Sequence, residues 1–299
     1  RTRTYLATAK QLYRCVIAPL EADLKTEGID TLTFILDSGL RSMPLAALHD
    51  GQNFLVERYR IGLMPSLSLA NTEYADLRKM QVLAAGATQF VDQNPLPAVS
   101  VELAAINDRW RGQSILDKAF TFDNLVKERK DTPFGIIHLA THGQFLPGKL
   151  SNSYIQLADK RLGLNQLRQL GWANPPVELV VLSACEMAVG DDNAELGFAG
   201  FAVKAGAKSA LASLWSVSDE GTAGLMAEFY EQLWKQPVKS EALRQAQRAM
   251  ISGKVRIENG QLIWSGGAVA LPPELADRRN QDLSHPYYWS TFTLIGSPW

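Results

Sequence analysis

Short apolar runs that alternate with helix-like stretches constrain the fold of this chain more than any other feature. The runs cover residues 134–140 (FGIIHLA), 177–182 (VELVVL) and 209–213 (SALAS), with helical patterns at 195–205 and 222–235. Apolar strands that alternate with helices form a largely parallel sheet with helices on both faces. The sequence therefore predicts an α/β fold built on a mostly parallel sheet, with chemistry at the carboxyl ends of its strands.

The rest of the chain supplies further elements and one internal boundary. Periodicity predicts helices at 5–25, 101–110, 122–130 and 240–251, and strands at 31–36, 82–85 and 292–295. Residues 54–56 and 60–63 suggest a small hairpin around the Asp50-Gly51 turn. A linker-like stretch from Asp92 (DQNPLPAVS) divides an N-terminal portion, residues 1–91, from a catalytic portion, residues 100–299. We expect both portions to form a single domain, residues 1–299.

Composition excludes several classes of function. The formal net charge is −1 with 46% apolar residues, so no basic footprint for nucleic acid or an anionic membrane is present. No apolar run approaches the roughly 18 residues of a membrane helix, and no signal-peptide pattern opens the sequence. Two cysteines cannot build a disulfide framework, which favours a reducing, cytoplasmic setting.

Two predicted strands end in residues suited to nucleophilic catalysis. The run FGIIHLA is followed by Thr141, His142 and Gly143, and the run ending at 182 is followed by Ser183, Ala184 and Cys185. Neighbouring parallel strands would bring these ends together at one edge. A cysteine with a pKa near 8.5 reacts as its thiolate and needs a neighbouring base, which His142 would supply to Cys185. Gly143, without a side chain, offers its backbone N–H to a substrate oxyanion.

Cys185 and His142 also have interpretations other than a catalytic pair. A cysteine in an apolar context is often a small buried hydrophobe, which is the alternative for Cys185. The chain has no CxxC or HExxH motif and no acidic cluster beside His142, so no metal is expected. It also lacks a phosphate loop or cofactor fingerprint, so no cofactor is expected and a small-molecule hydrolase or transferase is disfavoured.

The stretch SLWSVSDEGTAGLM, from Ser213, marks a third strand end. The strand is expected to end at Trp215, and Ser218 or Asp219 would cap the next helix. A second interpretation is compatible with capping. Ser213 and Trp215 would present a strand edge to an extended peptide, while Asp219 would pair with a basic side chain in a pocket.

The remaining polar residues have structural interpretations. His138 falls within the strand that precedes His142 and is expected to be a hydrogen-bonded core residue. Cys15 lies inside the first predicted helix and is also expected in the core. Arg244 and Arg248 lie one turn apart and are expected to form a solvated helix face.

Five stretches, in order along almost the whole chain, resemble the CHAT family of caspase-like domains found with tetratricopeptide repeats. The stretches are LRSMPLAALHDGQNFLVERYRIGLMPSLSL, HLATHGQF, VVLSACEMAVG, AGAKSALASLWSVSDEGTAGLMAEFY and HPYYWSTFTLIGSPW. The resemblance implies a caspase-hemoglobinase fold of clan CD and an endopeptidase dyad, with His142 as base and acid, Cys185 as nucleophile and Gly143 as an oxyanion donor. It also implies an N-terminal regulatory region of the tetratricopeptide type, which fits a chain that begins at Arg1 rather than Met.

The LWSVSD stretch is also similar to the separase segment whose aspartate recognises arginine before the scissile bond. On that likeness Asp219 would select Arg, and Lys second. Separase continues with further acidic residues, where this chain has Glu220, Gly221 and Thr222. The function expected from the sequence is a cytoplasmic cysteine endopeptidase that cleaves a protein substrate after a basic residue. The alternative is a non-catalytic interaction module with a gated or vestigial dyad.

Overall fold

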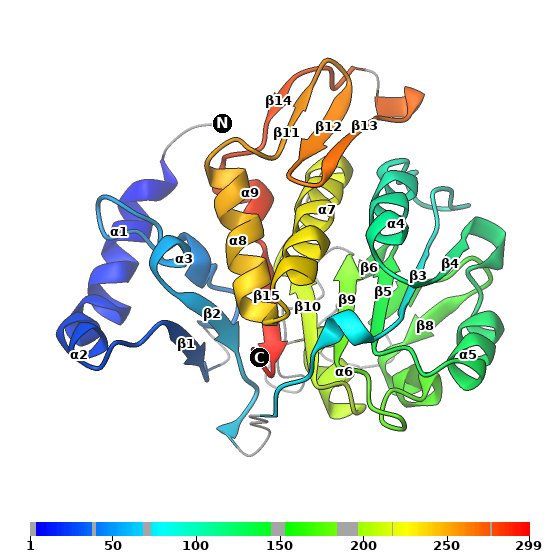
Figure 1. Ribbon diagram of the computed structural model, residues 1–299, viewed down its shortest axis with the longest axis horizontal. Coiled ribbons are helices and arrows are strands. Elements are labelled where there is room, and N and C mark those ends of the chain that lie inside the picture. The colour runs from blue at the N-terminus through cyan, green and yellow to red at the C-terminus, as the bar shows by residue number, and fades with distance from the viewer. Residues whose placement is uncertain are drawn as a thin grey trace.

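An eight-stranded sheet organises the computed structural model, which describes residues 4–37, 40–67, 73–144, 153–183, 197–216, 218–275 and 277–299 (Figure 1). In spatial order its strands are β1 (Thr31–Phe34), β2 (Arg60–Leu63), β15 (Phe292–Gly296), β10 (Ser209–Ser213), β9 (Leu179–Ser183), β5 (Ile136–Ala140), β3 (Val82–Gly86) and β4 (Gly112–Leu116). The predicted strands at 31–36, 82–85, 134–140, 177–182, 209–213 and 292–295 are confirmed within a few residues.

The sheet consists of two parallel blocks that meet at one antiparallel seam. Strands β10, β9, β5, β3 and β4 run parallel to one another, as do β1, β2 and β15. The seam joins β10 to β15, with Ser213 opposite Phe292. The carboxyl ends of five strands therefore share one edge, as the sequence predicts for a mostly parallel sheet.

Helices cover both faces of this sheet. On one face α4 (Ala98–Arg109), α7 (Asp219–Lys235) and α8 (Lys239–Ile251) pack side by side (Figure 1). The connection through α4 runs outward from β3 to β4, whereas α5 (Phe122–Asp131) returns the chain to β5. Right-handed crossovers then place α5 on the opposite face, together with α6 (Gly197–Lys204) and the 3-10 helix η8 (Leu164–Leu170).

The N-terminal region differs from the sequence-based expectation at two places. The helix predicted over 5–25 is divided into α1 (Tyr5–Val16), the 3-10 helix η1 (Ala18–Leu20) and α2 (Glu21–Thr26), because Pro19 has no N–H to continue the helical pattern. The predicted hairpin is wrong. Residues 55–58 form the short helix α3 (Leu55–Arg58), and β2 pairs in parallel with β1, which a crossover rather than a hairpin connects.

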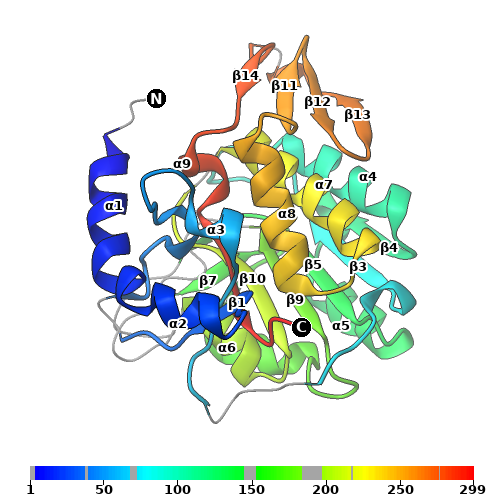
Figure 2. The same ribbon diagram turned by 60° about the vertical axis from the view of Figure 1, so that its left-hand side comes forward.

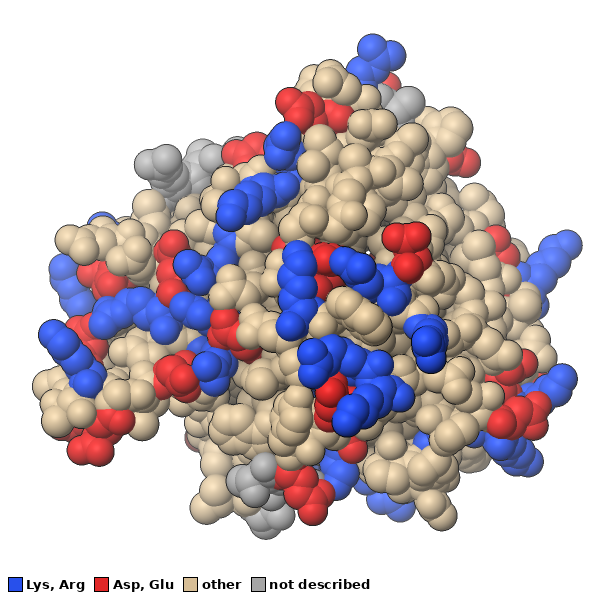
Figure 3. All heavy atoms as spheres, in the orientation of Figure 1, with Lys and Arg blue, Asp and Glu red and all other residues tan. Residues whose placement is uncertain are grey.

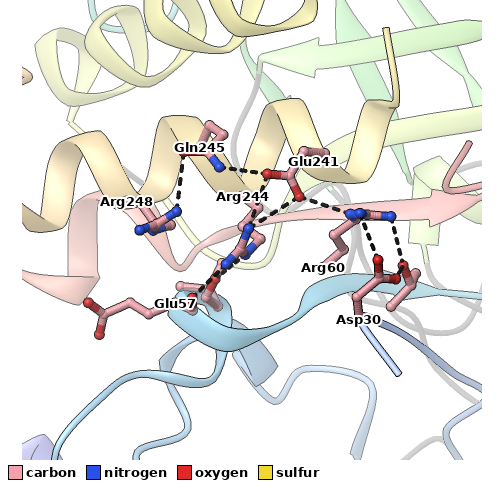
Figure 4. A network of polar contacts seen from close by, with 9 residues as sticks. Asp30, Glu57, Arg60, Glu241, Arg244, Gln245 and Arg248 are labelled. Carbon is pink, nitrogen blue, oxygen red and sulfur yellow. Dashed lines mark hydrogen bonds and ion pairs between the residues drawn. The ribbon is translucent and has the colours of Figure 1, made fainter. Parts of the chain in front are cut away.

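Arg244 connects α8 to this N-terminal region, so its assignment to a solvated face was wrong. Its guanidinium donates to the Glu57 carbonyl oxygen at 2.6 Å and forms an ion pair with Glu241 at 3.1 Å (Figure 4). Glu241 also binds Arg60 of β2 at 2.9 Å. Arg248 does lie on the exposed side of the helix. The backbone carbonyls at the end of α3 therefore find their donors on α8.

Two small sheets and several short helices complete the described chain. One sheet contains β11 (Arg256–Glu258), β12 (Gln261–Trp264), β13 (Gly267–Ala270) and β14 (Gln281–Asp282), and it extends beyond the ends of α7 and α8 (Figure 2). The other contains β6 (Gly143–Gln144), β7 (Tyr154–Gln156) and β8 (Arg161–Gly163). The short helices are η3 (Leu45–Ala47), η5 (Leu77–Lys79), η6 (Asp117–Ala119), η9 (Pro273–Leu275) and α9 (Pro286–Trp289).

Burial confirms one residue prediction and corrects another. His138 is fully buried in β5, where the Tyr230 hydroxyl lies 3.2 Å from its Nδ1. Cys15 is exposed, not part of the core. Tyr13 of helix α1 is buried and faces the core. Cys15 comes two positions later, about 200° around the helix, and therefore faces away from the core.

The charged side chains are mixed rather than segregated. Figure 3 shows Lys and Arg interspersed with Asp and Glu over the face that carries α7 and α8. Among the residues that the structure describes, no helix has the length and apolar character needed to cross a membrane.

Candidate functional site

The carboxyl edge of the five-strand block contains the ends of the two strands that the sequence singled out, β5 and β9. Ala140 of β5 pairs with Ser183 of β9, and the Thr141 N–H extends the pairing to the Ser183 carbonyl oxygen at 3.3 Å. In the sequence, His142 follows Ala140 by two positions, and Cys185 follows Ser183 by two positions. Cys185 itself lies outside the described residues. The register nevertheless places the two strand ends level and adjacent.

The loop between β3 and α4 fixes the orientation of the His142 imidazole. Its Nε2 lies 2.7 Å from the backbone oxygen of Asn94, and its ring meets the Phe90 ring edge-on at 4.6 Å between centroids. A carbonyl oxygen can only accept, so Nε2 must carry the proton. In the neutral ring Nδ1 then holds the lone pair that a general base requires.

Contacts with Gln156 of β7 hold the segment that contains His142. They leave the Gly143 N–H outside the strand pairing. The His142 carbonyl accepts the Gln156 N–H at 2.8 Å, and the Thr141 hydroxyl donates to the Gln156 oxygen at 2.5 Å. The hydrogen bond between the two strands is made by His142, the residue before Gly143. Gly143 faces Ile155 and therefore occupies a non-hydrogen-bonded position. Its own N–H points away from β7, the orientation that an oxyanion donor needs.

Asp219 lies where the N-termini of two helices meet. Ser218 caps α7 by accepting the Gly221 N–H at 3.2 Å, which leaves Asp219 as the first helical residue. The Asp219 Oδ2 accepts the N–H of Ala98, the first residue of α4, at 2.6 Å. Of the two capping residues proposed from the sequence, Ser218 is therefore the one that caps α7, and Asp219 bridges α7 to α4.

The Asp219 carboxyl is half-buried without a cationic partner among the described side chains. Burial raises its pKa from 3.8 to about 7; the Ala98 N–H opposes this rise, whereas Glu102 and Glu220 add to it. A carboxylate in such a setting gains from any cation brought to it, because an ion pair offsets the cost of desolvation.

Ser213 and Trp215 occupy the strand exit with most of their groups already engaged. Ser213 is fully buried and pairs with Phe292 across the seam. The Trp215 N–H donates to the Thr291 hydroxyl at 3.3 Å, and its indole Nε1 donates to the Tyr287 carbonyl oxygen at 3.3 Å. Ser213 is therefore part of the buried sheet, and Trp215 is held by residues 287 and 291.

A buried polar cluster lies under the site. Glu102 of α4 approaches His138 of β5 at 2.9 Å between Oε1 and Nε2, in a geometry that is not a regular hydrogen bond, and Tyr230 of α7 closes the cluster. Burial raises the pKa of Tyr230 well above 10, so the phenol stays protonated. The cluster ties β5 to the two helices whose N-termini hold Asp219.

Sequence reasoning missed the β3–α4 loop as part of the site. The stretch from Asp92, interpreted as linker-like, carries Asn94 to His142 and Ala98 to Asp219. One signal was present: the loop follows a fully buried strand, VLAAG, and loops at that position border sites in parallel sheets. No group of three or more potential metal ligands occurs among the residues with a described placement.

Comparisons with solved structures agree on the fold. A crystal structure of the Arg-specific cysteine proteinase gingipain R (RGPB) is similar with a TM-score of 0.59 and 13% identity, over 94% of this chain and 66% of that one. A complex of the pro- and mature domains of Porphyromonas gingivalis RgpB gives 0.58 and 13%, over 94% and 68%. The separase–securin complex of Saccharomyces cerevisiae gives 0.55 and 13%, over 96% of this chain and 17% of that one.

These likenesses and the sheet topology define a caspase-like α/β fold. A search of curated protein sequences finds no match. The CHAT domain family matches residues 6–297, almost the whole chain, and the chain belongs to that family.

Proposed function

We propose that this chain is a caspase-like cysteine endopeptidase that cleaves a protein substrate after Arg, or second after Lys. One observation supports the proposal: the Asn94 carbonyl oxygen lies 2.7 Å from His142 Nε2, which directs Nδ1 to serve as the base, and His142 follows a strand whose end is level with Ser183 of β9. Cys185, two positions after Ser183 in the sequence, would supply the thiol that nucleophilic catalysis requires. The relatives' fold and the family membership support the same class.

The proposed reaction has two stages. His142 Nδ1 takes the proton of the Cys185 thiol, and the thiolate forms a bond to the substrate carbonyl carbon. The oxyanion that results accepts the Gly143 N–H. The C–N bond then breaks, His142 returns the proton to the leaving amine, and a thioester remains. Water, deprotonated by His142, hydrolyses the thioester and regenerates the thiol.

Asp219 supports the basic preference. Its carboxyl is half-buried and lacks a cationic partner in the described structure, and a guanidinium would supply one. Ser213 and Trp215 lie at the exit of β10, beside which the residues before the scissile bond would lie. The known Arg specificity of gingipain R is that protein's own property, and for this chain the same preference is part of the proposal. We further propose a cytoplasmic setting and control by a regulatory region N-terminal to this domain, of the tetratricopeptide or another type.

The test is hydrolysis of a fluorogenic Arg peptide. Wild type should turn it over, Cys185→Ala and His142→Ala should not, and Cys15→Ala should be unaffected. Equal turnover by wild type and Cys185→Ala refutes the mechanism, and a preference for Asp over Arg refutes the role of Asp219.

A thiol-labelling assay separates an enzyme from a non-catalytic interaction module. Because Cys15 is exposed, the assay requires a Cys15→Ser background. Fast alkylation of Cys185 by iodoacetamide, slowed by His142→Ala, supports a working dyad. An inert Cys185 together with no hydrolysis favours the interaction module.

A further inference from the structure

A cavity of about 580 Å³ is lined in part by residues that contact His142. Its walls come from the β3–α4 loop (residues 89–93), the β4–α5 connection (117–121) and the β7–β8 turn (156–159). Two of its lining residues also contact the proposed base: the Phe90 ring packs on the imidazole, and the Gln156 N–H binds the His142 carbonyl. The cavity and the base therefore share their supporting residues.

The order of the strands indicates which residues of a bound peptide would reach the cavity. From β10 the sheet continues through β9, β5, β3 and β4. In the proposed function, on which this inference rests, residues before the scissile bond lie at β10 and Asp219, and His142 at the end of β5 protonates the leaving amine. The cavity lies further along the same edge, over β3 and β4. A peptide that crosses the site reaches it with the residues after the scissile bond.

The lining combines an apolar wall with an excess of acid. Phe90, Leu157 and Ala158 supply the apolar part, and Val91 beside them is fully exposed. Three aspartates line the cavity against one lysine, Lys118.

The acidic groups of the lining are not equivalent. Asp117 is engaged, because it accepts the N–H and the hydroxyl of Thr88 at 2.7 and 2.8 Å. Asp92 and Asp159 are exposed carboxylates, although Asp159 Oδ1 also accepts the Phe122 N–H at 3.4 Å. Gln93 adds a buried Oε1 for which the described residues offer no donor. An apolar wall with carboxylates at its exposed margin suits a side chain with an aliphatic stem and a cationic end.

We propose that this cavity is the leaving-side specificity site, and that it accepts Lys or Arg as the first or second residue after the scissile bond. The stem packs on Phe90 and Leu157, and the cation lies near Asp92 and Asp159. The substrate class is then a protein with basic residues on both sides of the cleaved bond.

The test uses internally quenched peptides that share Arg before the scissile bond and carry Lys, norleucine or Glu at each of the next two positions. A short Arg-aminocoumarin substrate, which does not extend into the cavity, reports basal activity. At one of the two positions, we expect kcat/KM for the Lys peptide to exceed that for the Glu peptide by about tenfold, as two exposed ion pairs allow. In 0.5 M NaCl, kcat/KM for the Lys peptide should fall toward the value for the norleucine peptide, because salt screens exposed charges. The double variant Asp92→Asn, Asp159→Asn should remove the Lys advantage and keep the aminocoumarin rate. Asp123→Asn, an exposed residue of α5 outside the cavity, is the matched control.

The outcomes separate this inference from the proposed function. Turnover of all peptides with no preference at either position overturns the cavity assignment alone. Equal losses on every substrate in the double variant also overturn it, since they would reflect damage to the support of His142. No turnover of any substrate by wild type overturns both.

Discussion

Replacing Asp219 with Asn should stabilise the protein while it removes activity on Arg substrates. The half-buried carboxyl accepts the Ala98 N–H, and desolvation raises its pKa to about 7 from 3.8. A raised pKa for an acid means that folding favours the neutral form. The contribution to stability is fully present below pH 3.8 and is lost as the pH rises through about 7. Asn keeps an oxygen for the Ala98 N–H and never ionises.

The magnitude follows from the same values. Each pH unit in this window changes the free energy of unfolding by about 1.4 kcal/mol, so the full span corresponds to about 4 kcal/mol as an upper figure. The advantage of Asp219→Asn over wild type should therefore grow between pH 4 and pH 7 and stay constant above. Urea unfolding at pH 4.5, 6 and 8 measures it. Asp108→Asn, on the exposed side of α4, is the control and should show no such trend.

Activity should change in the opposite direction. Loss of one partner of a buried charge pair costs at least about 2 kcal/mol, or roughly thirtyfold in kcat/KM for Arg peptides. For wild type, kcat/KM on Arg peptides should rise as the pH passes about 7, because the free enzyme must ionise Asp219. An Asp219→Asn variant that is no more stable than wild type at pH 8, or that cleaves Arg peptides normally, would refute the reasoning.

Three further substitutions test the packing around the site. Lys239→Met should raise the free energy of unfolding by about 3 kcal/mol at pH 7, since burial lowers the pKa of Lys239 to about 8 from 10.5 and penalises the charged form; calorimetry should show the gain vanish above pH 10.5. Gly86→Ala should cost about 3 kcal/mol in urea unfolding because its Cβ would overlap a carbonyl oxygen of β5, whereas Gly62→Ala, with no contact nearer than 3.6 Å, should cost far less. Glu102→Ala should cost about 1–3 kcal/mol by removing the carboxylate 2.9 Å from His138 Nε2 and leaving a buried gap, and an unchanged urea midpoint would contradict that cluster's role.

Local patterns predicted the fully buried central strands and missed an exposed edge strand. Strands β5 and β9 are apolar along their whole length, so composition alone marked them. Strand β4 escaped because it lies at the edge of the sheet and buries one residue, Ile115. The reversal of β15 could not be inferred, since its direction depends on pairing with β10, about 80 positions away in the chain.

The residues of the candidate site also divide into those that the sequence identified and those that it missed. Motifs and strand ends identified His142, Gly143 and Asp219, because those residue types are unusual where a buried strand ends. Asn94 and Ala98 contribute backbone atoms, and backbone atoms leave no mark on residue identity. Only the three-dimensional path of the β3–α4 loop reveals them.

The position of β15 also affects how the chain acquires its structure. Strands β2 and β10 have no pairing with each other, and β15, the last strand in sequence, pairs with both. During synthesis from the N-terminus, the two halves of the sheet must wait for residues 292–296 before they can join. Long-range closure of this kind slows folding, so completion of the eight-stranded sheet should be slower than formation of its two parallel blocks.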